Sequence, residues 1–122
     1  MLIAISSQGH SLDSQVDPRF GRAQYFILVD KEQGTHQVLD NRANLEAPKG
    51  AGIHAAQSIA ENKAQALITG HCGPKAFDAL QAGNIQVYYY HQEGTVQDAI
   101  QAFREGRLDR AHEPDSPVHR KA

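Results

Sequence analysis

The second half of the sequence alternates between helical and extended patterns, and this alternation constrains the fold more than any other feature. The predicted elements are, in order, a helix over residues 52–62, a strand over 65–69, a helix from Pro74 to a stop at Gly83, a strand over 85–90, and a helix capped by Thr95 and stopped by Gly106. Strand–helix–strand units cross over in the right-handed sense, so the strands that they connect lie parallel. The sequence therefore predicts an α/β sheet whose later strands are parallel.

The first half of the chain is richer in extended segments. Strands are predicted over residues 2–6, 24–30 and 36–41, and the last two are spaced as an antiparallel hairpin. The polar stretch 7–19 is too long for a hairpin turn and is predicted to be a loop. Together the two halves predict a mixed five-stranded sheet with about three helices packed on it.

Size and composition indicate one globular domain. The 122 residues are 40% hydrophobic and carry a formal net charge of −2, which leaves no basic excess for binding nucleic acid. No apolar run approaches the roughly 20 residues that span a bilayer, and the chain does not begin like a signal peptide. One cysteine forms no internal disulfide, so we expect a soluble cytoplasmic protein. Residues 1–108 form the predicted domain, and residues 109–122 are expected to be a disordered tail.

Five loops are expected to meet at one edge of the predicted sheet, the edge at which open α/β folds bind their ligands. They carry a concentration of imidazoles and cations, with one thiol: His10, Arg19, Arg22, Lys49, His54, His71, Cys72, Lys75 and His91. Two helices also begin there, near Gly52 and Pro74, and the unpaired N–H groups of a helix start attract anions. The convergence predicts an anion pocket with soft or borderline metal character. Any one of the glycines alone is more often a turn residue, and any one histidine a solvated loop residue.

The segment TGHCGPKAF, residues 69–77, contains Cys72 and matches no common catalytic motif. A cysteine phosphatase needs an arginine where this chain has Asp78, and the glycine spacing is too short for a P-loop. There is no C-x-x-C pair, and the thiols are too few for an iron–sulfur cluster held by cysteines alone. His71 and Cys72 are chain neighbours and are expected to point apart, while the helix start at Pro74 is expected to lower the thiol pKa and leave Cys72 partly thiolate. A nucleophile, a metal ligand and a small turn residue all stay open for this position.

Three stretches of the sequence carry a family resemblance: VDPRFGRAQYFILVD, GAGIHAAQSIAENKAQALITGHCGPKAFDAL and GTVQDAIQAFREGRL. They closely resemble the dinitrogenase iron–molybdenum cofactor biosynthesis family, in order and over about residues 2–108. The resemblance implies a ribonuclease-H-like, three-layer α/β fold. It also implies a non-enzymatic protein, without catalytic residues, that binds, carries or inserts a metal–sulfur cluster of molybdenum with iron or copper. The short chain favours a stand-alone carrier of the orange-protein type.

The resemblance also suggests where such an anionic cluster is held. The expected cluster contacts are Arg19, Phe20, Gly21, Arg22, Gly50, Gly52, Gly70, Gly73, Pro74 and Lys75, and the candidate metal ligands are Cys72, His71 and His54. Many family members have a histidine where this chain has Arg19, so binding here relies on charge and hydrogen bonding or on one of the three candidate ligands. The implied partners are the cluster itself and cluster-assembly or P-loop ATPase-type accessory proteins. Two other functions stay open: a cysteine-dependent hydrolase or transferase acting on a small anion, and a regulatory module that senses an anion.

Overall fold

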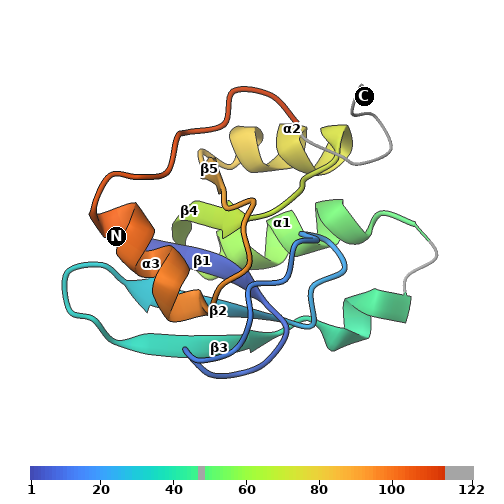
Figure 1. The fold of residues 1–122 in the computed structure, drawn as a ribbon. Coiled ribbons are helices and arrows are strands. Elements are labelled where there is room, and N and C mark those ends of the chain that lie inside the picture. The colour runs from blue at the N-terminus through green and yellow to red at the C-terminus, as the bar shows by residue number, and fades with distance from the viewer. Residues whose placement is uncertain (47–48, 115–122) are drawn as a thin grey trace.

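The computed structural model describes residues 1–46 and 49–114, and its elements follow the predicted order (Figure 1). The strands are β1 (Leu2–Ser7), β2 (Tyr25–Asp30), β3 (His36–Asp40), β4 (Ala64–Thr69) and β5 (Gln86–Tyr89). The helices are α1 (Ala51–Glu61), α2 (Pro74–Ala82) and α3 (Val96–Arg104). A short 3₁₀ helix, η1 (Arg42–Glu46), lies between the predicted strand 36–41 and the predicted helix 52–62, where the sequence indicated no regular element.

The five strands form one mixed sheet in the order β3-β2-β1-β4-β5. β1 lies in the middle, antiparallel to β2 and parallel to β4, with Ile5 opposite Ile27 on one side and Ile68 on the other. β2 and β3 form the predicted antiparallel hairpin, and β4 and β5 the predicted parallel pair. The predicted fold class, a mixed five-stranded α/β sheet, is confirmed.

Helices cover both faces of the sheet, which gives three layers (Figure 1). Side chains alternate between the two faces along a strand, so Ala4 of β1 packs in the core beneath α1 and α2, while Ile3 and Ile5 pack in the core beneath α3. Because β1 is covered on both faces, all of its apolar residues from Ile3 to Ile5 are fully buried. Because β1, β4 and β5 run parallel, their carboxyl ends lie at one edge of the sheet, and the loops that follow them meet there.

The polar loop between β1 and β2 is fixed against the rest of this edge. The N–H of Asp17 donates to the carbonyl of Ser6 at 2.8 Å, and the N–H of Val16 donates to the carbonyl of Gly94 at 2.9 Å. The Ser6 hydroxyl donates in turn to the Asp17 carbonyl at 2.7 Å. This loop is therefore a defined wall of the edge, despite its length and polar composition.

After α3 the chain returns along β5. Arg110 forms an antiparallel β-bridge with Tyr88, and the N–H of Ala111 donates to the carbonyl of Val87 at 2.7 Å. The Tyr89 hydroxyl donates to the carbonyl of Glu113 at 3.0 Å. Arg110, Ala111 and Glu113, in the segment that the sequence assigned to a disordered tail, are thus hydrogen-bonded or bridged to β5, because bonds to a strand edge compensate for the few apolar groups of this segment. The remainder of the predicted tail, residues 115–122, lies outside the described residues.

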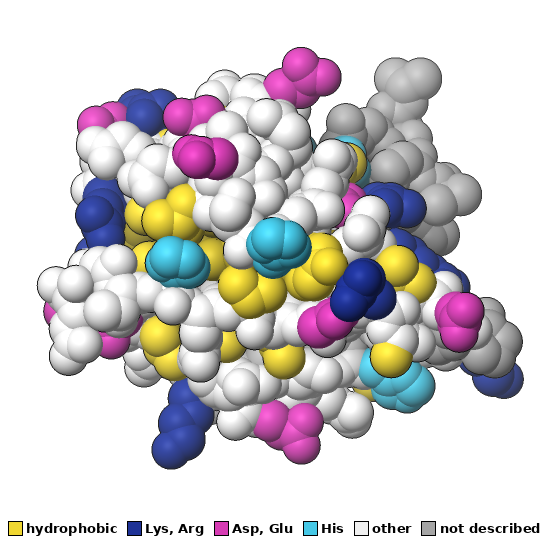
Figure 2. Space-filling model, turned by 90° about the horizontal axis from the view of Figure 1, so that it is seen from below, with side chains coloured by type: hydrophobic (Ala, Val, Ile, Leu, Met, Phe, Trp, Pro, Cys, Tyr) yellow, Lys and Arg dark blue, Asp and Glu magenta, His cyan; other side chains and the backbone are white. Residues whose placement is uncertain are grey.

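Charged side chains of both signs are scattered over the face seen from below in Figure 2, between patches of hydrophobic side chains. This agrees with the small net charge of the chain. None of the helices in the described ranges combines the length and the apolar character needed to cross a membrane.

Candidate anion-binding pocket

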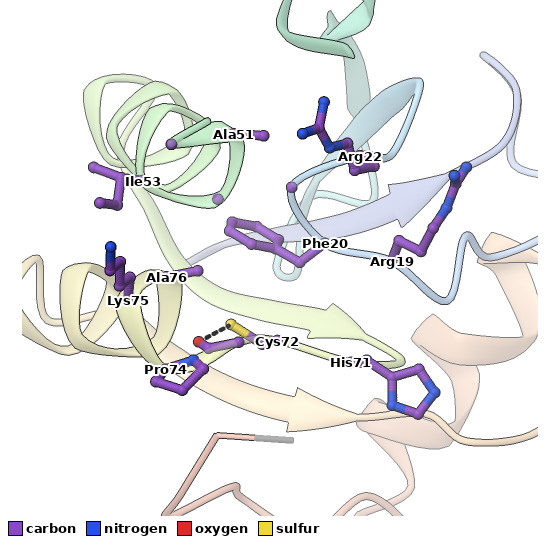
Figure 3. A pocket seen from close by; sticks show the side chains of 14 residues that line it. Arg19, Phe20, Arg22, Ala51, Ile53, His71, Cys72, Pro74, Lys75 and Ala76 are labelled. Atoms are coloured by element: carbon purple, nitrogen blue, oxygen red, sulfur yellow. Dashed lines mark hydrogen bonds between the residues drawn. The ribbon is translucent and has the colours of Figure 1, made fainter. Parts of the chain in front are cut away.

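A pocket of about 580 Å³ opens at the predicted edge, between the starts of α1 and α2 (Figure 3). Its lining comes from three chain segments, the loop before β2, the start of α1 and the turn between β4 and α2: Arg19, Phe20, Gly21, Arg22, Gly50, Ala51, Gly52, Ile53, His71, Cys72, Gly73, Pro74, Lys75 and Ala76. Most of the residues that the sequence proposed for a site are therefore brought together, although they are up to 57 positions apart in the chain, from Arg19 to Ala76.

Two helices begin at this pocket without a side-chain cap. The N-cap residues are Gly50 for α1 and Gly73 for α2, and neither helix start carries a side-chain cap hydrogen bond. α3, which begins elsewhere, has a complete capping box between Thr95 and Asp98. The first N–H groups of an α-helix have no partner within the helix, so the starts of α1 and α2 present backbone donors and a positive dipole end to the pocket.

Close packing of small residues holds the three segments together. A Cβ atom added to Gly21 would lie 2.7 Å from the backbone nitrogen of Gly52, and one added to Gly52 would lie 2.7 Å from the Cβ of Ala76. Real Cβ atoms do not approach other atoms so closely, so both positions need glycine. Both glycines are among the expected cluster contacts, and the structure shows that they also let α1 pack on its neighbours.

Two asparagines that the sequence analysis did not single out strengthen this arrangement. The side-chain amide of Asn41 donates to the carbonyls of Gly21 at 3.2 Å and Ala23 at 2.7 Å. The amide of Asn44 donates to the carbonyl of Ala51 at 2.7 Å. They tie the end of β3 and η1 to two of the pocket segments. Asparagine in a loop is a common turn residue, so only the tertiary contacts reveal this role.

Arginine side chains approach the pocket from the loop before β2. The Arg22 Nη1 donates to the carbonyl of Leu45 at 2.8 Å, which fixes the position of the guanidinium group. Arg19 forms an ion pair with Asp17, whose side chain is fully buried, with Nε 3.2 Å from Oδ1. Hydrogen bonding and charge attraction by Asp17 raise the pKa of Arg19. Arg19 is therefore held at the rim as a permanent cation, and its partner Asp17 is a positioning residue that sequence reasoning missed.

Cys72 does not behave as the sequence predicted. Its side chain is only 2% exposed and packs in the core beneath α1 and α2. The thiol donates weakly to the carbonyl of Gly73, with 3.8 Å between Sγ and the oxygen (Figure 3). Burial raises the pKa of Cys72 to about 12, so the prediction of a partly ionised thiol was wrong. Removal of the thiolate from water outweighs the attraction of the helix start.

His71 lies on the rim of the main pocket and also lines a second pocket. As predicted for chain neighbours, its ring points away from the Cys72 sulfur (Figure 3). The ring stacks on His91 with 5.6 Å between ring centroids, and His91 stacks on Tyr89 at 5.3 Å. The backbone of His71 is paired with the loop before β2, since its N–H donates to Pro18 at 2.7 Å and its carbonyl accepts from Phe20 at 3.2 Å. A second pocket of about 300 Å³ lies on the other side of His71 and includes His91 and Gly70.

The remaining candidates from the predicted convergence lie apart from the main pocket. His54 is exposed on α1, with its Nε2 4.0 Å from a Cβ built on Gly50, and is not part of the lining. His10 packs edge-on against Tyr25. Lys49 is exposed and is likewise not part of the lining. Among the residues that the structure describes, no three histidine, cysteine, aspartate or glutamate side chains form a group able to hold a metal ion.

The sequence matches a known protein family over most of its length. The family model described as "Dinitrogenase iron-molybdenum cofactor" matches residues 1–106. An uncharacterized protein from Methanocaldococcus jannaschii is 29% identical over 101 residues, which cover 80% of this chain and 84% of that protein.

Solved structures show the same relationship. The apo form of the orange protein from Desulfovibrio gigas is 43% identical, with a TM-score of 0.92 over 94% of this chain and 96% of that one. A putative NifB protein from Thermotoga, solved by NMR, is 40% identical, with a TM-score of 0.79 over 89% of this chain and 91% of that one. Both similarities extend over most of this chain and of the solved one.

Proposed function

Because the chain belongs to the dinitrogenase iron–molybdenum cofactor family, we propose that it binds an anionic, molybdenum-containing metal–sulfur cluster in the pocket between α1 and α2. The cluster is cargo, either the iron–molybdenum cofactor or a smaller sulfide of molybdenum with copper or iron. The protein would hold it during assembly, storage or delivery in the cytoplasm and exchange it with cluster-assembly proteins, without catalysing a reaction.

The observation that carries this proposal is the pair of uncapped helix starts facing one pocket. Each presents backbone N–H groups and a partial positive charge, and the lining adds Arg19, Arg22 and Lys75. No Asp or Glu is among the lining residues. Such a site attracts an anion whose charge is spread over several sulfur atoms. The apolar lining by Phe20 and Ile53 suits a ligand that is softer and less hydrated than phosphate.

The donor set favours binding by charge and hydrogen bonding over direct metal coordination. To bind a metal, a thiol must be deprotonated and an imidazole neutral, and burial keeps the Cys72 thiol protonated. Of the three candidate ligands, His71 is best placed to reach a bound cluster, because it lies on the pocket rim, although its ring already stacks on His91. His54 would have to reach the pocket from the outer surface of α1.

A titration of the apoprotein with tetrathiomolybdate and copper(I), and separately with isolated iron–molybdenum cofactor, tests the proposal. Binding should produce a charge-transfer absorption band and should shift the NMR signals of residues 19–22, 50–53 and 71–76. Lys75→Gln and Arg22→Gln should each weaken binding about tenfold or more, since a hydrogen bond to a charged group contributes about 1.5–3 kcal/mol.

Arg107→Gln is the matched control. It removes the same charge from an exposed side chain that is paired with Glu105 near the end of α3 and does not line the pocket. A general effect of net charge would lower affinity equally in all three variants. NMR shifts confined to segments outside the pocket, or equal losses in the control and the pocket variants, would contradict the proposed site.

The two other functions make different demands on the same pocket. A cysteine-dependent hydrolase needs a thiolate within reach of its substrate, and the buried, protonated Cys72 does not supply one. A sensor of simple anions would bind phosphate or sulfate with no metal present. If these anions compete with the thiomolybdate at similar concentrations, the sensor hypothesis gains support over the carrier hypothesis.

A further inference from the structure

The described part of the chain covers one edge strand of the sheet and leaves the other edge strand uncovered. Residues 110–113 pair with β5 and cover that edge. β3 lies at the other end of the strand order, with no described strand beyond it. All of its residues are exposed except the half-buried Leu39, and Val38 is the exposed large hydrophobic residue of the described chain, at 42%. An uncovered edge strand is a template for pairing with another strand.

The register between β2 and β3 shows which backbone groups face outward. The N–H of Asp30 donates to the carbonyl of Thr35, and the N–H of Asn41 donates to the carbonyl of Gln24. Hydrogen-bonded positions alternate along an antiparallel pair, so residues 35, 37, 39 and 41 direct their N–H and C=O groups toward β2. The intervening residues His36, Val38 and Asp40 direct theirs away from the sheet.

We propose that β3 is the docking site for β3 of a second copy of this chain, paired antiparallel about a two-fold axis that passes through Val38. In this register Val38 faces the partner's Val38, and His36 faces the partner's Asp40 at both ends. These are the residues whose backbone groups point outward, so the pair forms about six N–H to C=O hydrogen bonds. Ten strands then form one continuous sheet.

The side chains of β3 are complementary to themselves in this register. His36, Val38 and Asp40 project from the same face, because side chains two positions apart share a face. The exposed apolar residue meets its own copy, and a basic side chain meets an acidic one on either side. Asp40 is held by Arg42 at 2.8 Å, and this hydrogen bonding lowers the pKa of Asp40 to about 2. Its carboxylate is thus ionised and oriented. A shift of the register by one residue would lose every one of these pairings.

The pairing leaves the proposed anion pocket unobstructed, because no residue of β3 lines it. β3 lies at the lower side of the molecule in Figure 1. Figure 2 shows the molecule from that side, with hydrophobic patches between charges of both signs. Dimer formation and cluster binding therefore use different residues, and each can fail while the other holds.

Disulfide trapping tests the register directly. In a hydrogen-bonded antiparallel pair the facing Cα atoms lie about 5.5 Å apart, within the range that a disulfide spans. Val38→Cys should therefore give a covalent dimer under mild oxidation, while the native Cys72 is buried and does not interfere. Gln57→Cys places a thiol on the exposed surface of α1 and is the matched control. Equal rates of cross-linking in the two variants would overturn the proposed register.

Sedimentation of the unmodified protein gives the second test. The apparent mass should rise from 13.4 kDa toward twice that value as the concentration approaches about 1 mM. His36→Asp places like charges opposite each other twice and should weaken the dimer about three- to tenfold. Adding Asp40→Lys should restore it, and Gln57→Asp, with the same change in net charge, should have no effect. A protein that stays at 13.4 kDa throughout, or a dimer insensitive to His36→Asp, would overturn the proposal.

Discussion

The Cys72 thiol should stay protonated far above neutral pH, and its alkylation rate measures this directly. Because burial raises its pKa from 9.0 to about 12, the thiolate fraction at pH 8 falls from about one in ten to about one in ten thousand. The thiolate is the reacting form. Iodoacetamide should therefore modify the folded protein about 1,000-fold more slowly than the same chain in denaturant.

The same shift predicts a loss of stability in alkali. The folded pKa lies above the unfolded one, so the stabilisation is fully present below about pH 9 and is lost as the pH rises toward 12. At about 1.4 kcal/mol per pH unit, the free energy of unfolding should fall by about 2 kcal/mol between pH 8 and pH 10.5. Cys72→Ala lacks the thiol and should not show this part of the loss.

Urea unfolding of the native protein and of Cys72→Ala at both pH values measures the difference. Tyrosines and lysines titrate in both proteins and cancel in the comparison. A stability difference that is the same at pH 8 and pH 10.5 would show that Cys72 titrates normally in the folded state. Cys72 would then be available as a thiolate nucleophile, and the hydrolase hypothesis would have to be reconsidered.

Three substitutions test how the pocket is built. Gly52→Ala should lower the free energy of unfolding by about 1–3 kcal/mol in thermal melts, because its Cβ would lie 2.7 Å from that of Ala76; an unchanged melt would contradict the packing. Gly73→Ala is its control, since a Cβ there meets no atom within 4 Å, and should cost less than about 1 kcal/mol. Thr95→Ala removes the capping box of α3 and should cost about 1 kcal/mol in urea unfolding. NMR signals of the pocket should stay in place in Thr95→Ala, and large shifts there would show that α3 and the pocket are coupled.

The fold could be predicted because the periodicity of the sequence agrees with the structure in every main element. The helical spacing that includes Ala56 and Ile59 matches the buried side of α1. The short apolar runs of β1 and β2 match strands that are buried on both faces, so local pattern is enough to reveal these elements. The position of residues 109–114 could not be predicted in the same way. Their order depends on hydrogen bonds to Val87 and Tyr89, which lie far away in the sequence.

The sequence predicted which loops meet at the pocket, but its prediction of a partly ionised thiol at Cys72 was wrong. Placement after β4 and before α2 correctly put this residue at a helix start, but a helix dipole contributes only about 0.3–1 kcal/mol. A pKa rise from 9.0 to about 12 corresponds to about 4 kcal/mol. Burial therefore dominates, and burial depends on packing that a local pattern does not show. Asp17 and Asn41 were missed for the same reason, since their roles arise from contacts between distant segments.

The protonated state of Cys72 also allows the mode of cluster binding to be measured by proton release. Coordination by this thiol would require it to lose its proton, so one proton would be released for each cluster bound. Binding through backbone N–H groups, Arg22 and Lys75 releases none from these donors. Calorimetric titrations in two buffers with different ionisation enthalpies should therefore give the same heat of binding at pH 7.5. A difference equal to one proton per cluster in the native protein, absent in Cys72→Ala, would show that the thiol becomes a ligand. In that event the cluster must supply enough binding energy to overcome the burial that keeps Cys72 neutral, and its release to a partner would be correspondingly slow.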